Sequence, residues 1–72
     1  MESIQLYPNP TTSILNLSSE TKINKIEVVN IYGKIVKVTK ETSFSIEELS
    51  AGAYFAIIST DNNKHPLRFV KQ

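Results

Sequence analysis

Apolar residues recur at every second position along most of this chain, and that period is what most constrains its fold. Val, Ile, Tyr, Phe and Thr fill short segments that are separated by turn-forming Gly, Pro, Asn and Ser. Alternation at period two places apolar side chains on one face of a strand, whereas side chains return to the same face of a helix about every 3.6 residues. The pattern therefore predicts strands and gives no indication of a long helix.

Seven strands are expected between the turn signals. We place them at Ile4–Tyr7, Ile14–Leu17, Ile26–Tyr32, Lys34–Thr39, a short segment marked by Phe44 and Ile46, Ala53–Thr60 and Leu67–Lys71. The almost continuously apolar run from Ala53 to Thr60 predicts a central strand buried on both sides. Pro66 is expected only at the start of the last strand, because proline cannot donate to a ladder. Residues 47–52 are expected to form one helical turn that ends at Gly52.

Strands of this length, with turns about eight to twelve residues apart, predict an all-β, seven-stranded immunoglobulin-like β-sandwich. The 72 residues make one domain, and a domain of this size buries only roughly 60% of its unfolded surface. The chain has no cysteine, so stability must come from the packing of the sheets. We expect Tyr54 and Phe44 in the core, and a positive φ angle at Gly33 and Gly52.

The charge balance argues against nucleic acid or an anionic membrane as partner. The chain carries 8 basic and 7 acidic residues, for a formal net charge of +1, and such a balance produces no strong field. No apolar run approaches the roughly 18 residues of a membrane span, and the N-terminus lacks the pattern of a signal peptide. We therefore expect neither membrane insertion nor nucleic-acid binding.

Catalytic and metal-binding arrangements are weakly supported. The single histidine, His65, lies four residues from Asp61 in one predicted turn, and no nucleophile elbow accompanies them. A calcium site would draw on Asp61, Asn62, Asn63 and Glu47, which offer too few carboxylates in one loop. Glu47 and Glu48 are neighbours in sequence and seldom point at one reacting atom. We expect no enzyme activity, metal site or cofactor.

Aromatic residues raise the alternative of carbohydrate binding. A sugar-stacking platform would draw on Tyr7, Tyr32, Phe44, Tyr54, Phe55 and Phe69. The chain has no tryptophan and no clustered aromatic run, so core packing is the favoured interpretation. A small adhesive or carbohydrate-binding sandwich appended to a secreted hydrolase remains the main alternative function, and a structural spacer is a third.

Three motifs follow one another along the chain: Tyr7-Pro8-Asn9-Pro10-Thr11, Leu49-Ser50-Ala51-Gly52-Ala53-Tyr54 and Arg68-Phe69-Val70-Lys71. With the segment 30–36 between them, they resemble the type A C-terminal sorting domain of the type IX secretion system, from Leu6 to Lys71. The chain departs from that pattern at Thr12-Ser13, where Ser-Gly often follows, and at Arg68, where lysine is frequent. The family pattern usually ends at a lysine, and in this chain Gln72 follows that lysine, Lys71.

The resemblance implies a non-catalytic sorting signal. Cargo would reach the periplasm, the domain would bind the type IX outer-membrane machinery, and the cargo would cross to the cell surface or the medium. A sortase-like protease would then remove the domain. The cargo is expected upstream in the same precursor, with residues 1–5 an artificial start or the end of a linker and residues 6–72 the sorting domain.

The recognition residues that the resemblance implies are Pro8, Asn9, Pro10, Gly52, Tyr54, Arg68, Phe69, Val70 and Lys71. Alternation along the last strand predicts that Phe69 and Lys71 share one face and that Arg68 and Val70 share the other. A receptor would therefore have to contact both faces of this strand, as it does when it pairs with a strand edge.

Overall fold

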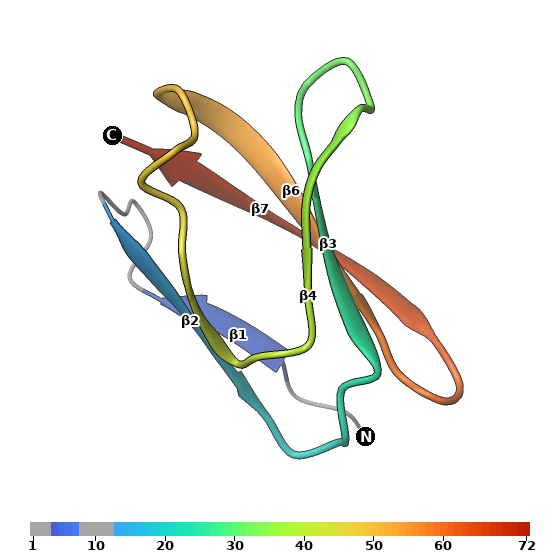
Figure 1. Ribbon diagram of the computed structural model, residues 1–72. Helices are drawn as coiled ribbons and strands as arrows, with labels where there is room; N and C mark the ends of the chain where they lie inside the picture. The colour runs from blue at the N-terminus through green and yellow to red at the C-terminus, as the bar shows by residue number, and fades with distance from the viewer. Residues whose placement is uncertain (1–3, 8–12) are drawn as a thin grey trace.

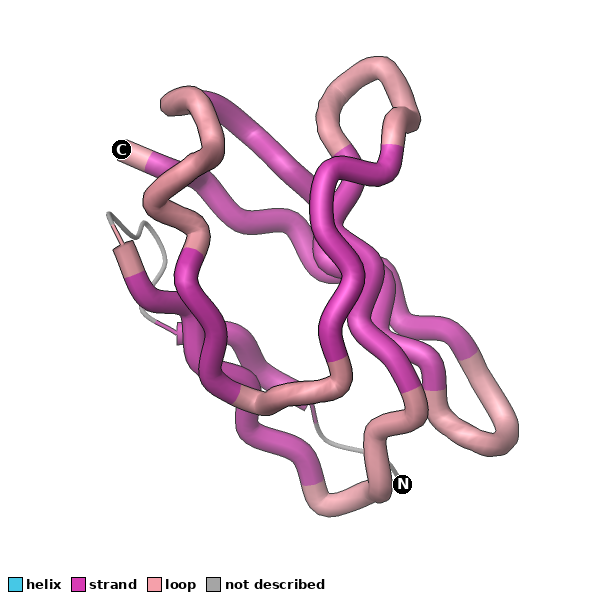
Figure 2. The backbone as a smooth tube through the Cα atoms, in the orientation of Figure 1, coloured by secondary structure: helices cyan, strands magenta, loops and turns pink. Residues whose placement is uncertain are grey.

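The computed structural model describes residues 4–7 and 13–72 and is all-β (Figure 1). Its strands are β1 (Ile4–Tyr7), β2 (Ile14–Ser19), β3 (Lys25–Val29), β4 (Ile35–Thr39), β5 (Ser43–Ser45), β6 (Gly52–Ser59) and β7 (Lys64–Lys71). They form two antiparallel sheets, of order β1-β2-β5 and β4-β3-β6-β7. Figure 2 shows strand and loop and no helix in this part of the chain, which confirms the predicted all-β sandwich.

The core lies between the sheets and is built by the alternation that the sequence predicted. Its buried apolar side chains are Leu15, Leu17, Ile26, Val28, Phe44, Ile46, Tyr54, Ala56, Ile58 and Phe69. On β3 and β6, every second residue points inward, because successive side chains of a strand face opposite sides. The predicted burial of Tyr54 and Phe44 is confirmed, with exposed fractions of 7% and 6%.

The fourth strand distinguishes this sandwich from a constant-type immunoglobulin domain. In that domain the fourth strand extends the sheet of the first, second and fifth strands, whereas here β4 pairs with β3 in the other sheet. A tight turn enforces this pairing. The side-chain oxygen of Asn30 accepts hydrogen bonds from the amides of Tyr32 and Lys34, at 2.9 and 3.0 Å. Gly33 supplies the positive φ angle of 83° that the turn requires.

Several predicted strand ends were wrong. The second strand was expected to close at Leu17 but continues to Ser19, because its last residues pair with the start of β1. The third strand ends at Val29 and not at Tyr32, because Asn30 begins the turn. The expected helical turn at 47–52 is a single β-turn, in which the Leu49 amide donates to the Ile46 carbonyl at 3.0 Å.

The last two strands also differ from the prediction. The strand β6 is central, between β3 and β7, but it is not buried on both sides. Its outward side chain Phe55 is 40% exposed, because no second layer covers that face among the described residues. The strand β7 begins at Lys64, so Pro66 lies inside it. An edge strand tolerates proline, since on one side of the strand its backbone N–H groups are not needed for hydrogen bonds to a neighbouring strand.

Candidate recognition surface

The β6–β7 ladder brings two of the three sequence motifs together. Antiparallel pairing places Gly52 opposite Lys71 and Ala53 opposite Val70. Tyr54 lies opposite Phe69, and their rings stack with centroids 5.7 Å apart and an interplanar angle of 19°. Paired residues that lie 15 positions apart in sequence (Tyr54 and Phe69) to 19 positions apart (Gly52 and Lys71) thus form one continuous strip at the end of the larger sheet.

The two faces of this strip differ. Phe69 is 0% exposed and lies on the inner face with Tyr54, and by alternation Lys71 shares that face. Arg68, opposite Phe55, is exposed on the outer face, which Val70 shares. The predicted distribution of the last four motif residues is confirmed. Phe69 therefore anchors β7 to the core.

Tyr54 also anchors the loop before β6. Its hydroxyl donates a 2.7 Å hydrogen bond to the carbonyl of Ser50, four residues upstream. A tyrosine that bonds back to the chain before its own strand forms the tyrosine corner of immunoglobulin-like sandwiches. Gly52, between donor and acceptor, has a φ angle of 148°. This value lies in the region that favours glycine, as predicted, so the motif has a structural role in holding the corner.

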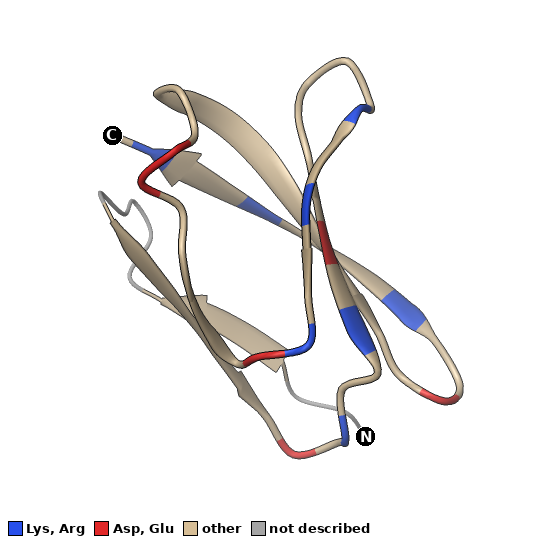
Figure 3. Ribbon diagram, in the orientation of Figure 1, with Lys and Arg blue, Asp and Glu red and all other residues tan. Residues whose placement is uncertain are grey.

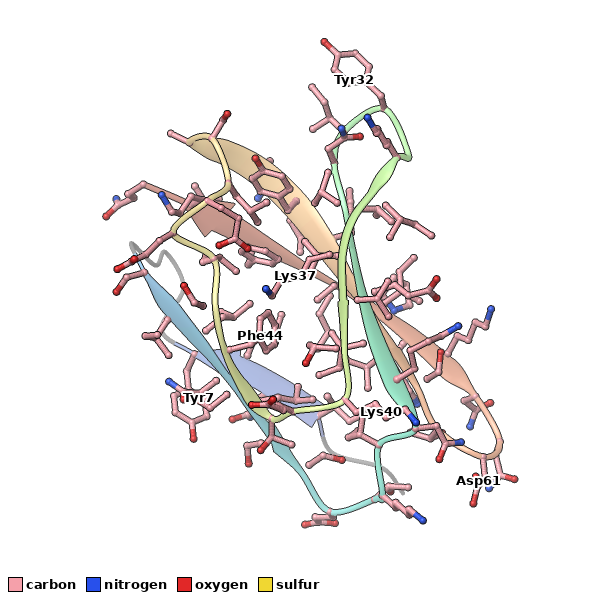
Figure 4. All side chains as sticks on the ribbon, in the orientation of Figure 1. Tyr7, Tyr32, Lys37, Lys40, Phe44 and Asp61 are labelled. Atoms are coloured by element: carbon pink, nitrogen blue, oxygen red, sulfur yellow. The ribbon has the colours of Figure 1, made fainter. Side chains whose placement is uncertain are left out.

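The corner forms one wall of a shallow cavity of about 290 Å³ at the end of the sandwich. The other wall is the β3–β4 turn, with Asn30, Ile31 and Tyr32. Tyr32 is 88% exposed and Ile31 66%, and Figure 4 shows the Tyr32 ring projecting away from the body of the molecule. We call this cavity the end groove. It joins the middle segment 30–36 to the second motif, a proximity that the sequence analysis did not predict.

Basic positions lie along β4 and acidic positions lie on the β5–β6 connection (Figure 3). The Lys37 ammonium lies 3.2 Å from a carboxylate oxygen of Glu48. A hydrogen bond from the backbone amide of Glu48, followed by the bond from Lys37, holds the pKa of Glu48 below its ordinary value, and the positive field of Lys71 adds to this effect. Glu48 thus links β4 to the β5–β6 connection. The sequence analysis did not predict this pair.

Other candidate sites are dispersed. Asp61 accepts a 2.8 Å hydrogen bond from the side chain of Asn24, and His65 lies in β7 opposite Ile58, so the two do not share a turn as expected. Residues 4–7 and 13–72 contain no group of three His, Cys, Asp or Glu side chains placed to hold a metal ion. Nor does this part of the chain contain a helix long and apolar enough to cross a membrane.

The aromatic residues do not form a platform. Phe44, Tyr54 and Phe69 are buried. Figure 4 shows Tyr7 and Tyr32 at opposite ends of the molecule, and Phe55 lies on the outer face of the larger sheet. A sugar ring has no set of adjacent exposed aromatic faces on which to stack, so the structure does not favour the carbohydrate-binding alternative. The first motif, Pro8-Asn9-Pro10, lies outside the described residues.

A small two-layer β-sandwich with a tyrosine corner is an immunoglobulin-like domain. A family model described as the secretion system C-terminal sorting domain matches residues 5–72. The chain belongs to this family, which is the C-terminal sorting signal of type IX secretion. A comparison with curated proteins found no match. Membership implies an interaction with the type IX machinery, an upstream cargo in the precursor, and transit to the outer membrane or the extracellular space.

Proposed function

We propose that the secretion machinery recognises the strip formed by β6 and β7. Its members are the predicted recognition residues Gly52, Tyr54, Arg68, Phe69, Val70 and Lys71, and Pro8, Asn9 and Pro10 are proposed to contribute beside them. The observation that carries this proposal is the ladder that pairs Gly52 with Lys71 and Phe55 with Arg68. Folding assembles the strip, so an unfolded chain does not display it.

Within this strip the residues divide into two roles. Tyr54 and Phe69 are buried and position the strand. Arg68 is exposed and Lys71 half-buried, so their charged ends are the groups that a receptor contacts. Because the two side chains leave opposite faces of β7, the receptor surrounds the strand end and does not dock on one flat patch.

We further propose that the domain is not a catalyst and that it leaves the cargo by proteolysis. Cargo would pass through the periplasm, and a sortase-like protease would cut upstream of Leu6. The scattered positions of Asp61, His65 and Glu48 support the non-catalytic role, because acid–base chemistry needs groups that converge on one atom. Mass measurement of secreted cargo would locate the cut, and a cargo that retains the intact domain would contradict this step.

The recognition step is tested by secretion of a fused cargo. A signal peptide, a fluorescent protein and this domain are joined in that order and expressed in a bacterium that has the machinery. The variant Arg68→Ala with Lys71→Ala should reduce the secreted fluorescence and leave the melting temperature nearly unchanged, because charges at the protein surface contribute about 0 to 1 kcal/mol each. Equal secretion by this variant and the unmodified domain would overturn the assignment.

A matched control is Lys22→Ala with Lys64→Ala, which removes the same charge from exposed positions elsewhere, one of them at the far end of β7. This control should secrete normally. Deletion of residues 68–72 is a poor substitute for the double variant. It removes Phe69, which is 0% exposed, so a loss of secretion would also follow from unfolding.

A further inference from the structure

The strand β4 is an open edge of the larger sheet. It pairs with β3 on one side only, and the register of that pairing shifts between Val28 and Val29, so that Val36 is an extra residue on β4. The other edge strands are shorter or contain proline: β1 and β5 have four and three residues, and β7 contains Pro66. An unpaired strand edge presents backbone donors and acceptors that can pair with another chain.

Exposed apolar residues accompany this open backbone. Val38 is 55% exposed, Val36 36% and Ile35 50%. Val38, opposite Glu27, lies on the outer face of the sheet, and Val36 is the extra residue of the bulge beside it. The inward Lys37, opposite Val28, is already paired with Glu48 at 3.2 Å. The strand β4 thus offers two exposed valines beside an unpaired edge.

The lysines at both ends of β4 determine which segments can pair with its open edge. Lys34 and Lys40 bracket the strand and are both exposed, and the lysine positions along β4 are drawn in blue in Figure 3. The ion pairs of the described residues are Lys25–Glu27 and Lys37–Glu48, so neither bracketing lysine is neutralised by them. Antiparallel pairing of β4 with a second copy, centred on Lys37, would place Lys34 opposite Lys40, and like charges directly opposite are destabilising. In this register, pairing of β4 with β4 of a second copy of the domain is therefore disfavoured.

We propose that β4 accepts an extended segment of a partner protein as an additional antiparallel strand. The segment carries two apolar residues at alternate positions, opposite Val36 and Val38, and an acidic residue at each end, opposite Lys34 and Lys40. Backbone bonds to the edge supply affinity, and the side-chain pattern supplies selectivity. This site is separate from the β6–β7 strip and does not depend on export.

The test is a titration of the ¹⁵N-labelled domain with synthetic peptides. The matched peptide Glu-Thr-Val-Thr-Val-Thr-Glu should shift the amide signals of residues 34–40 most. The peptide Lys-Thr-Val-Thr-Val-Thr-Lys should bind roughly tenfold more weakly, because two attractive pairs become repulsive. The peptide Glu-Thr-Pro-Thr-Pro-Thr-Glu has the charge of the first but cannot pair as a strand, so it should not bind.

A charge reversal in the domain provides the second arm. The variant Lys34→Glu with Lys40→Glu should prefer the lysine peptide over the glutamate peptide, and both preferences should weaken in 1 M salt, where the screening length is about 3 Å. Three results would each overturn the proposal: no binding of the matched peptide, equal binding of the proline peptide, or shifts centred on β7. Binding to vesicles with anionic lipid, without binding to the matched peptide, would assign the face to a membrane and also overturn it.

Discussion

The hydroxyl of Tyr54 provides the sharpest test of how the domain is held together. It donates a 2.7 Å bond to the Ser50 carbonyl from a side chain that is 7% exposed. Tyr54→Phe removes this bond, keeps the ring stacked on Phe69, and leaves the carbonyl without this partner. We expect a loss of about 1 to 2 kcal/mol in the free energy of unfolding.

In a domain of this size that loss is large. Stability of roughly 0.05 to 0.15 kcal/mol per residue gives about 4 to 11 kcal/mol in total, and about 1 kcal/mol shifts the melting temperature by roughly 4 to 8 °C. Tyr54→Phe should therefore lower the melting temperature by roughly 4 to 16 °C. Tyr54→Ala also removes the buried ring and should cost about 3 to 5 kcal/mol, which approaches the lower bound of the total.

The assay is thermal and urea unfolding of the isolated domain, followed by circular dichroism. Tyr32 supplies the matched control, since its ring is 88% exposed. Tyr32→Phe should change stability by less than about 0.5 kcal/mol. If Tyr54→Phe and Tyr32→Phe have the same melting temperature, the hydrogen bond from Tyr54 to Ser50 contributes nothing to stability. The structural role assigned to the second motif is then wrong.

Three further predictions follow from local geometry. Gly52→Ala should destabilise the domain by about 1 to 3 kcal/mol because of its φ angle of 148°, and this cost comes from the backbone, since the added Cβ would meet no atom within 4 Å. A synthetic chain with D-alanine there should keep its melting temperature, because a D residue adopts a positive φ angle readily. Asn30→Ala should cost about 1 kcal/mol by loss of its two turn bonds, measured against Asn62→Ala in an exposed turn. The lowered pKa of Glu48 means that its contribution is present above its ordinary value of 4.5 and is lost as the pH falls through the lower folded pKa. The difference in melting temperature between the unmodified domain and Glu48→Gln should therefore shrink in acid, and a difference that grows in acid would contradict the Lys37 pairing.

Period-two alternation was sufficient to predict the number of strands and their approximate positions. The burial of Phe44 and Tyr54 was predicted from the usual place of aromatic side chains in a core. Alternation failed at strand ends, because these depend on pairing partners elsewhere in the chain. Ser18 and Ser19 resemble a turn in sequence but pair with β1. Pro66 resembles a strand boundary but lies at an edge that tolerates it.

The arrangement of residues on the surface was harder to predict from the sequence. The motif order identified the family, and alternation gave the faces of Arg68 and Lys71. The end groove depends on a turn at Asn30 and a loop at Ser50 meeting in space, and no local pattern encodes that proximity. The Lys37–Glu48 pair likewise joins residues 11 apart on different elements. The one available signal was the inward position of Lys37 on an alternating strand, which requires a nearby carboxylate.

The two sheets are interleaved along the chain. The smaller sheet needs the first, second and fifth strands, and the larger one needs the third, fourth, sixth and seventh. Neither sheet can therefore be completed from one contiguous stretch of sequence, and both must close loops between distant segments before they gain stability. A shortened tag that keeps only the last two strands would contain the proposed recognition residues but lack β3, against which β6 pairs. We therefore expect that such a tag does not fold and that sorting needs the whole domain.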